Sequence, residues 1–483
     1  MKLSRPDLFR QAAYLAGTWV PAGTDGIDVL NPSTGARLGA VPKITASQTG
    51  QAIEQAQTAF HTFKRLTGKQ RSAMLRRWYE LMLQHAQDLA TIMTAEQGKP
   101  LSEARAEIDY AAAYLEWFAE EAKRVYGDTI LAPKASQRIS VTKEAVGVCA
   151  AITPWNFPSA MVTRKIGPAL AAGCTVVLKP AQQTPFSALA LCVLAEEAGF
   201  PAGTISVLTG ESASIGGELL ANPSVRKLSF TGSTPVGKTL MAAAAGTVKK
   251  LSLELGGNAP FIVFEDADLD AAVAGAMLSK FRNAGQTCVC ANRFLVHRDI
   301  HDAFVAKLAH AVAGMKMGDG FDPASQLGPL IDAKAIEKVS RLVDDAREAG
   351  AIVLQGGRHH QAGKHFYAPT VLTEVTSHME ISREEIFGPV VAVQRFSNEA
   401  EAVEIANATP YGLAAYFYTR DLNRTIRVSE ALDFGIVGVN EGAVSTEVAP
   451  FGGVKESGFG KEGSKYGLEE YLEKKYVCVG NVA

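Results

Sequence analysis

The sequence lacks the features that mark membrane proteins and nucleic-acid-binding proteins. Its 48 Lys and Arg residues nearly balance its 50 Asp and Glu residues and are spread along the chain, so we expect no nucleic-acid surface. No apolar run reaches the roughly 18 residues that cross a membrane, and the first residues contain no signal-peptide core. These absences favour a cytoplasmic protein without a membrane or nucleic-acid partner.

Cysteine is also scarce, with six residues in a chain of 483. That number excludes a disulfide-stabilised scaffold. No Cys-x-x-Cys pair and no Cys/His group with zinc spacing occurs, so the sequence predicts no metal site. The histidines His359, His360 and His365 lie in a segment typical of a solvated loop.

A chain of 483 residues is too long for one hydrophobic core, and we expect two or three domains. Residues 46–125 have the helical spacing of apolar side chains. The C-terminal segment YLEKKYVCVG alternates like an edge strand. From about residue 145, the short β-runs GVCAAIT, CTVVLKP, TISVLTG and VRKLSF alternate with the helical segments SAMVTRKIGPALAAG, FSALALCVLAEEAG and SIGGELLANP. A second such series follows residue 251, with the β-runs APFIVF, ANRFLVHR, AIVLQGG and VVAVQRF. This alternation predicts an α/β fold with parallel, doubly wound sheets.

Two segments could carry chemistry directly. Cys288 follows a Gly-Gln-Thr turn and precedes Cys290 by two residues. A thiol in such a polar loop is a candidate nucleophile, although a buried structural cysteine is the alternative. After the β-run KLSF, a helix begins around Gly232, Ser233 and Gly237, with Ser233 or Thr234 as a suitable N-cap and Pro235 in the first turn. A helix N-terminus at a strand end binds anions such as a pyrophosphate, and an ordinary strand–helix turn is the alternative.

Three further residues stand where a β-run ends. Lys179 follows one run and could reach a ribose or a phosphate. Asn156 lies between two prolines and offers a stiffly held amide donor, as an oxyanion hole requires. Glu254 has apolar neighbours, which would raise its pKa and suit a general base. The structural alternatives are a solvated lysine, a turn-capping asparagine and a surface glutamate.

The literal Gly-x-Gly-x-x-Gly string lies elsewhere, at residues 458–463. It follows a loop rather than a parallel strand, so it lacks the context of a dinucleotide-binding fingerprint. We therefore expect this string to have no role in binding a dinucleotide.

Taken together, these segments resemble the NAD(P)-dependent aldehyde dehydrogenases. The matching strings follow the family's order along nearly the whole chain: TPWNFP at 153–158, KPAQQTP at 179–185, FTGSTPVG at 230–237, LELGG at 253–257, GQTCVCANR at 285–293, EEIFGPV at 384–390 and PFGGVKESGFG at 450–460. The resemblance implies the aldehyde dehydrogenase fold: a Rossmann-like cofactor domain at 1–124 and 146–252, an α/β catalytic domain at 253–460, and a small β oligomerisation flap from 125–145 and 461–483. It also implies a homodimer or a homotetramer.

By this resemblance, catalysis falls to Cys288, Asn156 and Glu254. Cys288 is the nucleophile that attacks the aldehyde carbon, and the site must raise its thiolate fraction. The Asn156 amide and the Cys288 N–H hold the resulting oxyanion, and one such donor is worth about 3 kcal/mol. After hydride transfer to the nicotinamide, Glu254 activates the water that hydrolyses the thioester.

The resemblance also implies the cofactor contacts. They are Trp155, Lys179, Gln182, Gly232, Ser233, Gly237, Leu255, Glu385 and Phe387. Gln182 stands where NAD-preferring members carry a glutamate, and a neutral side chain does not repel the 2′-phosphate of NADP. Lys179 is near enough in sequence to pair with that phosphate. We therefore expect NADP to be preferred and NAD to be usable.

The closest resemblance within the family is to succinate-semialdehyde dehydrogenases. That subgroup binds the distal carboxylate of its substrate at positions matched here by Arg164, Arg282 and Ser445, and arginine grips a carboxylate through two donors. Glutarate semialdehyde is the alternative substrate, because one methylene is worth only ~1–3 kcal/mol of discrimination.

Two questions stay open in the sequence. Cys290 is either a redox partner that forms a disulfide with Cys288 or a spare small residue. A CoA-acylating enzyme and a non-catalytic relative are the competing functions, and the presence of both Glu254 and Cys288 argues against them.

Overall fold

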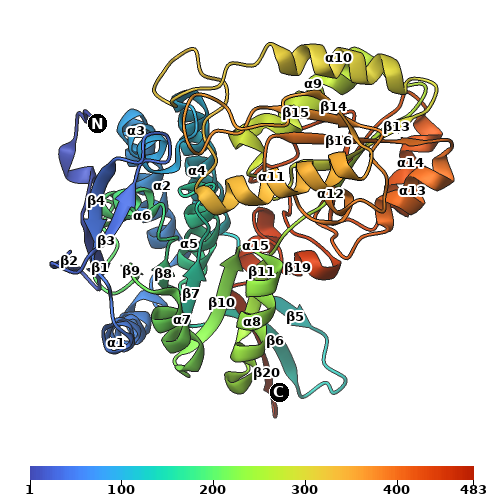
Figure 1. Cartoon of the computed structure of the whole chain (residues 1–483). Coiled ribbons are helices and arrows are strands. Elements are labelled where there is room, and N and C mark those ends of the chain that lie inside the picture. The colour runs from blue at the N-terminus through green and yellow to red at the C-terminus, as the bar shows by residue number, and fades with distance from the viewer. Residues whose placement is uncertain (483) are drawn as a thin grey trace.

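The computed structural model describes residues 1–482, which form two α/β lobes side by side and a narrow arm (Figure 1). An eight-stranded sheet is the centre of the first lobe, and a seven-stranded sheet is the centre of the second. The predicted α/β fold with parallel sheets is confirmed. In the part of the chain that the structure describes, no helix has the length and apolar character needed to span a bilayer.

The eight-stranded sheet of the first lobe is parallel in its central part. Its order is β19 (Gly458–Phe459), β11 (Lys250–Glu254), β10 (Val225–Thr231), β7 (Val148–Ile152), β8 (Thr175–Lys179), β9 (Ile205–Val207), β1 (Ala12–Leu15) and β2 (Thr18–Pro21). Strands β11 to β9 run parallel, whereas β19, β1 and β2 pair antiparallel at the two edges. The central strands are almost wholly buried, as expected when helices cover both faces.

Helices connect and cover these strands. The N-terminal helices are α1 (Ala46–Phe63), α2 (Gly68–Gln84), α3 (Ala86–Gln97) and α4 (Leu101–Glu121), and the crossover helices are α5 (Ala160–Ala172), α6 (Pro185–Glu197), α7 (Ser212–Ala221) and α8 (Thr234–Ala244). The predicted helical region at 46–125 and the predicted crossover helices are confirmed. Ser233 is the N-cap of α8 and Pro235 lies in its first turn, as the sequence predicts.

The second lobe repeats the parallel arrangement. Its sheet has the order β14 (Ile352–Gln355), β15 (Thr370–Thr373), β16 (Val390–Phe396), β13 (Ala291–His297), β12 (Ala259–Val263), β17 (Ala414–Tyr418) and β18 (Ile436–Val439). Only β14 pairs antiparallel. Its helices are α9 (Leu269–Phe281), α10 (His301–Ala313), α11 (Ala333–Glu348), α12 (Glu380–Arg383), α13 (Glu399–Asn407) and α14 (Leu422–Ala431). The sequence had predicted β12, β13, β14 and β16 but not the other three strands.

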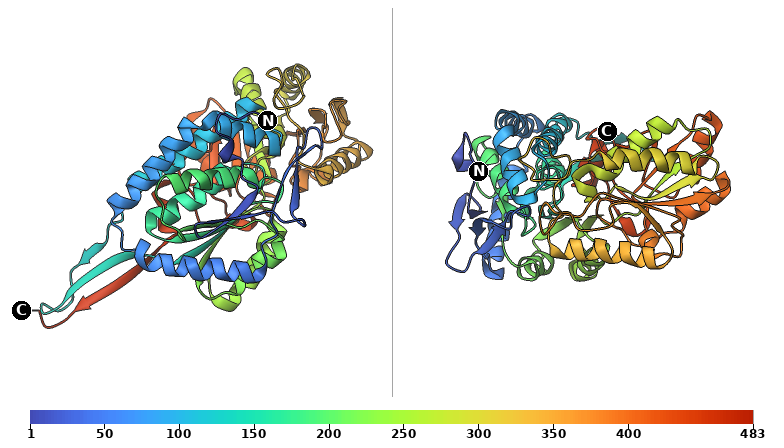
Figure 2. Two further views of the ribbon diagram at one scale, coloured as in Figure 1. Left: turned by 90° about the vertical axis from the view of Figure 1, so that its left-hand side faces the viewer. Right: turned by 45° about the horizontal axis from the view of Figure 1, so that its top comes forward.

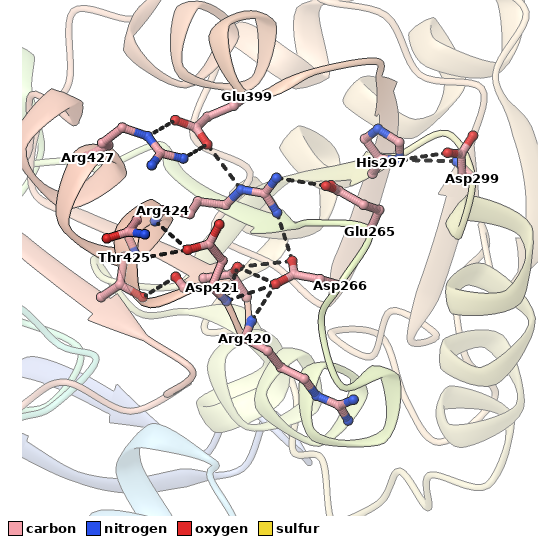
Figure 3. Close-up of polar contacts among 12 residues, drawn as sticks. Glu265, Asp266, His297, Asp299, Glu399, Arg420, Asp421, Arg424, Thr425 and Arg427 are labelled. Atoms are coloured by element: carbon pink, nitrogen blue, oxygen red, sulfur yellow. Dashed lines mark hydrogen bonds and ion pairs between the residues drawn. The ribbon is translucent and has the colours of Figure 1, made fainter.

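A cluster of charged side chains ties α14 to the end of β12 (Figure 3). The Arg424 guanidinium forms ion pairs with Glu265, Asp266 and Glu399 at 2.7, 2.8 and 3.1 Å. Asp266 also accepts hydrogen bonds from the Arg420 and Asp421 N–H groups, just before α14 begins. The start of this helix is therefore held by carboxylates from two other elements.

A three-stranded antiparallel sheet projects from the two lobes as an arm (Figure 2). Its order is β20 (Leu472–Val479), β6 (Arg138–Ala145) and β5 (Asp128–Ile130), so the predicted C-terminal edge strand is confirmed. After Leu472, every residue of β20 is exposed. A hairpin of β3 (Ile27–Leu30) and β4 (Arg37–Val41) and the short α15 (Ser464–Glu469) complete the elements. The division into domains at the boundaries given above stays a prediction.

Candidate active site

A cavity of about 330 Å³ lies where β7, β10 and β11 end. Its wall is formed by the loop after β7, the turn after β10, the residues after β11, Cys288, the first turn of α11 and the segment after α12. In open parallel sheets, ligands bind beyond the carboxyl ends of the strands. The position of this cavity therefore agrees with a cofactor and substrate site.

Cys288 lies half-buried in this wall, in a loop with an unusual backbone. Asn283 and Ala284 have φ values of 51° and 54°, in the left-handed region that residues other than glycine seldom adopt. The residues after β11 approach the loop closely, since a Cβ on Gly257 would lie 2.4 Å from the Cys288 carbonyl oxygen. Only glycine fits at position 257, so the two segments can touch through their backbones.

Asn156 lies next to the Cys288 loop with one donor to spare. Its Nδ2 donates to the Gln286 carbonyl at 2.9 Å, and its Oδ1 accepts from the Phe157 N–H at 3.2 Å. An amide NH₂ group has two donors, so one N–H of Asn156 is left. Among the described residues, the Cys288 N–H also has no hydrogen-bond acceptor. These two free donors belong to the residues from which the sequence leads us to expect an oxyanion hole, and that role stays a prediction.

The surroundings of Cys288 favour the neutral thiol, contrary to the expectation of a raised thiolate fraction. Burial raises the pKa of the Cys288 thiol to about 12, and Glu385 and Glu254 add to this effect. The charges of Arg164 and Arg282 act in the opposite direction and are outweighed. In the absence of ligands, the thiol is therefore protonated at neutral pH.

Glu254 is buried at the end of β11 and does not line the cavity. Neither of its carboxyl oxygens has a hydrogen-bond partner, and Oε1 lies 2.8 Å from where a Cβ on Gly452 would be. Burial raises the pKa of Glu254 well above its ordinary value, and the nearby Glu462 raises it further. To activate water in the cavity, this side chain has to turn toward Cys288 and lose its proton.

Most of the predicted cofactor residues surround the cavity. Those that line it are Trp155, Gly232, Ser233, Leu255, Glu385 and Phe387. The Trp155 and Phe387 rings meet edge to face at 5.6 Å, and the Glu385 carboxylate accepts the Gly257 N–H at 3.0 Å. Burial raises the pKa of Glu385 to about 7. Gly237 lies beneath the wall, where a Cβ would collide with Leu255.

Lys179 and Gln182 lie outside this cavity, beyond the neighbouring strand β8. Burial lowers the pKa of Lys179 to about 8, and the carboxylate of Glu211 opposes that shift. Gln182 donates to the Gly210 carbonyl at 2.9 Å. The two residues therefore share one edge with the start of α7, and the sequence had not pointed to Glu211 as their neighbour.

The three predicted anchors for a carboxylate have different surroundings. Arg282 and Ser445 share a second, small cavity with Thr287, immediately before Cys288. The Arg282 guanidinium lies 4.7 Å over the Phe157 ring, and Arg282 and Phe157 also line a third cavity with Glu103 and Glu107. Among the described residues, the guanidinium has no ion-pair partner within 4 Å, so its charge is free to receive an anion.

Arg164 is buried and already paired. Its guanidinium lies 2.9 Å from the Glu462 carboxylate and 3.9 Å over the Phe451 ring. Lys165 also contacts Glu462. Glu462 belongs to the Gly-x-Gly-x-x-Gly string, whose first residues form β19 antiparallel to β11. The string thus supplies a buried counter-charge, and its position at an antiparallel edge agrees with the expectation that it binds no dinucleotide.

Cys290 is buried, and its thiol lies near the carbonyls of Lys280 and Ala291 at 3.6 and 3.5 Å. It does not line the cavity, and both Cys288 and Cys290 are free thiols. The redox role of Cys290 stays a prediction.

Sequence reasoning missed the wall formed by Ile331, Asp332, Lys334, Ala335 and Lys338. These residues form the entry and first turns of α11, where Asp332 caps the helix by accepting the Ala335 N–H. The capping residue before an amphipathic helix was a visible signal for the helix. Nothing in the sequence indicated that this helix end faces Cys288.

Comparison with known proteins agrees with this geometry. The model of the aldehyde dehydrogenase family matches residues 19–477. The chain belongs to the aldehyde dehydrogenase family. It is 57% identical to an NADP(+) succinate-semialdehyde dehydrogenase of Escherichia coli, over 99% of this chain and 100% of that protein. It is also 57% identical to a glutarate-semialdehyde dehydrogenase of Pseudomonas aeruginosa, over 100% of both chains.

Two further relatives widen the comparison. A 3-sulfolactaldehyde dehydrogenase of Pseudomonas putida is 57% identical over 100% of this chain and 99% of that protein. The crystal structure of succinate-semialdehyde dehydrogenase from Burkholderia pseudomallei superimposes with a TM-score of 0.98 at 56% identity, covering 99% of this chain and 100% of that one. The predicted membership of this family and the aldehyde dehydrogenase fold are thus confirmed.

Proposed function

We propose that this aldehyde dehydrogenase oxidises succinate semialdehyde to succinate, with NADP+ preferred and NAD+ usable. The observation that carries the choice of substrate is that Arg282, whose guanidinium has no ion-pair partner among the described residues, lines a small cavity with Ser445 beside the Cys288 loop. An aldehyde with a distal carboxylate can be gripped there while its carbonyl reaches Cys288. The names of the similar proteins, from Escherichia coli and Burkholderia pseudomallei, support this choice.

Cys288, Asn156 and Glu254 each have a separate role in the proposed reaction. The Cys288 thiol loses its proton to water as its sulfur attacks the aldehyde carbon, and the spare Asn156 N–H and the Cys288 N–H receive the oxyanion. A nicotinamide cofactor, when bound, would accept the hydride that leaves this carbon, and a thioester of Cys288 would remain. Water deprotonated by Glu254 then adds to the thioester, which releases the carboxylic acid and the thiol.

The cavity fits a nicotinamide cofactor. Ser233 lines the cavity and is the N-cap of α8, so the N-terminus of this helix lies where a pyrophosphate can bind. Glu385 and Trp155 line the cavity, where Glu385 would hold a ribose hydroxyl and Trp155 would line the cofactor groove. Lys179 and Gln182 lie together at the neighbouring strand end and would receive the adenosine ribose with its 2′-phosphate.

Arg282 provides the test of the substrate. We expect Arg282→Gln to raise the KM for succinate semialdehyde by roughly 10- to 100-fold, because a charge-assisted pair worth about 1.5–3 kcal/mol is lost. The KM for butanal, which has no carboxylate, should stay within about threefold of the wild-type value. Arg347→Gln, on the exposed end of α11, is the control. An unchanged KM for succinate semialdehyde would remove Arg282 from substrate binding.

Glutarate semialdehyde stays the alternative substrate, since a glutarate-semialdehyde dehydrogenase is equally similar in sequence. A steady-state panel of C3 to C6 semialdehydes against both cofactors compares the two by kcat/KM. Omitting and adding CoA in the same panel tests the CoA-acylating alternative.

We also propose that the enzyme is cytoplasmic and assembles as a homodimer or homotetramer through its arm. The edge strand β20 supports this assembly, because its outer side has no neighbouring strand within the described chain.

A further inference from the structure

A buried ion pair lies behind the candidate oxyanion hole. Lys99 stands in the turn between α3 and α4, and its Nζ contacts the Glu107 carboxylate at 2.5 Å. Their side chains are 1% and 2% exposed. Taking two charges out of water costs free energy that their attraction often fails to repay. A contribution to stability alone therefore does not explain why this buried ion pair is present.

Both members of the pair also hold the backbone on either side of Asn156. Lys99 Nζ donates to the Asn156 carbonyl at 2.8 Å. The second oxygen of Glu107 accepts the N–H groups of Ser159 and Ala160 at 3.0 and 3.2 Å, at the start of α5. The loop that carries Asn156 is thus fixed at its own carbonyl and three residues further on.

The same region of the chain also holds the Cys288 loop. Asn283, whose backbone is left-handed, donates from Nδ2 to the Asn156 carbonyl at 3.0 Å. Its Oδ1 accepts from Gln97 Nε2 at 2.9 Å, and its N–H donates to the Glu103 carboxylate at 2.8 Å. The Asn156 carbonyl therefore receives one donor from the α3–α4 turn and one from the Cys288 loop.

We propose that Lys99, Glu107 and Gln97 are positioning residues that fix Asn156 and Cys288 relative to each other. None of the three lines the cavity that contains Cys288. They act through Asn156 and Asn283, so that the Asn156 amide and the Cys288 N–H converge on one point. An oxyanion hole needs this precision, since a displacement of about 1 Å can lower the rate roughly 100-fold.

The experiment replaces the pair without leaving a buried charge alone. In Lys99→Met/Glu107→Gln, the glutamine keeps an oxygen for the Ser159 and Ala160 N–H groups, and the donor to the Asn156 carbonyl is lost. We expect kcat to fall roughly 10- to 100-fold while the KM values for aldehyde and cofactor change less than about threefold. Lys249→Met is the matched control, because this lysine also donates to backbone carbonyls, those of Asn222 and Val225, and should leave kcat unchanged.

A double-mutant cycle separates positioning from a general loss of structure. When Asn156 is already alanine, the same pair substitution should lower kcat by less than about twofold, because there is no amide left to position. Equal losses with and without Asn156 would overturn the proposal, as would a kcat within twofold of the wild type. If the pair variant does not fold, Gln97→Met is measured in the same cycle and judged by the same criteria.

This inference rests on the proposed roles of Asn156 and Cys288. The double-mutant cycle distinguishes failure of the proposed oxyanion hole from failure of the positioning role. If Asn156→Ala alone leaves kcat unchanged, the proposed oxyanion hole fails. If Asn156→Ala lowers kcat but the pair substitution adds its full effect on top, only the positioning role fails.

Discussion

At the scale of single residues, the surroundings of the proposed nucleophile Cys288 favour its protonated thiol. Burial raises the pKa of its thiol to about 12, above the values at which a free cysteine ionises. A raised pKa lowers the thiolate fraction at neutral pH. The enzyme without ligands should therefore protect this thiol from oxidants and alkylating agents until a ligand changes its surroundings.

The pH dependence of alkylation tests this property. In the cofactor-free enzyme, the rate of Cys288 alkylation by iodoacetamide should still rise between pH 9 and pH 11, because ionisation is incomplete across that range. Peptide mass mapping follows Cys288 separately from the exposed Cys478. A rate that levels off near pH 8 would contradict the raised pKa.

Cofactor choice also belongs to a single residue. Gln182→Glu places a carboxylate beside the edge that would hold the 2′-phosphate of NADP. We expect kcat/KM for NADP to fall roughly 10- to 100-fold, because like charges at short range cost about 1–3 kcal/mol. The kcat/KM for NAD should change little. The control is Gln183→Glu at the exposed neighbouring position. Equal losses for both cofactors would contradict the assignment.

At the scale of elements, the charged cluster at the start of α14 should contribute to stability (Figure 3). Arg424 has a side chain that is only 14% exposed and meets three carboxylates. Arg424→Met should lower the free energy of unfolding by about 1–3 kcal/mol, because these carboxylates lose their counter-charge. Arg427→Met, whose side chain is 53% exposed, should lower the free energy of unfolding less than Arg424→Met does, because solvent screens its ion pair.

The same cluster makes the stability of the folded protein depend on pH. Burial raises the pKa of Asp266, but hydrogen bonds from Thr419 and the Arg420 N–H and the charge of Arg424 outweigh burial and leave the pKa below its usual range. A lowered pKa stabilises the folded protein above about pH 4, and this contribution is lost as the pH falls further. Urea unfolding at pH 7 and pH 3 should therefore show a smaller effect of Arg424→Met at the lower pH.

The sequence predicted elements and single chemical groups better than contacts between them. Ser233 and Pro235 indicated the start of α8, because helix capping depends on residues that are neighbours in the sequence. The contact between Lys99 and the Asn156 carbonyl joins residues 57 positions apart, and that between Gln97 and Asn283 joins residues 186 apart. Such pairings depend on how whole elements pack, so no local pattern in the sequence indicates them.

At the scale of the whole molecule, the arm is the part that fits an assembly. Beyond Leu472, β20 is exposed, and its outer edge offers unpaired backbone groups for strand addition. Deletion of residues 474–483 should reduce the mass measured by light scattering to that of a monomer. Tyr476→Ser should keep the assembly, because pairing through main-chain groups does not need this side chain. An unchanged mass after the deletion would place the contact elsewhere.

The pairing of β19 with β11 has a consequence for synthesis on the ribosome. Strand β11 ends at Glu254, yet its antiparallel neighbour and the Glu462 counter-charge for Arg164 and Lys165 are translated some two hundred residues later. Until then, the nascent first lobe carries an open strand edge and two cations without their carboxylate. The buried surroundings of Glu254 are thus completed only when nearly the whole chain has been translated.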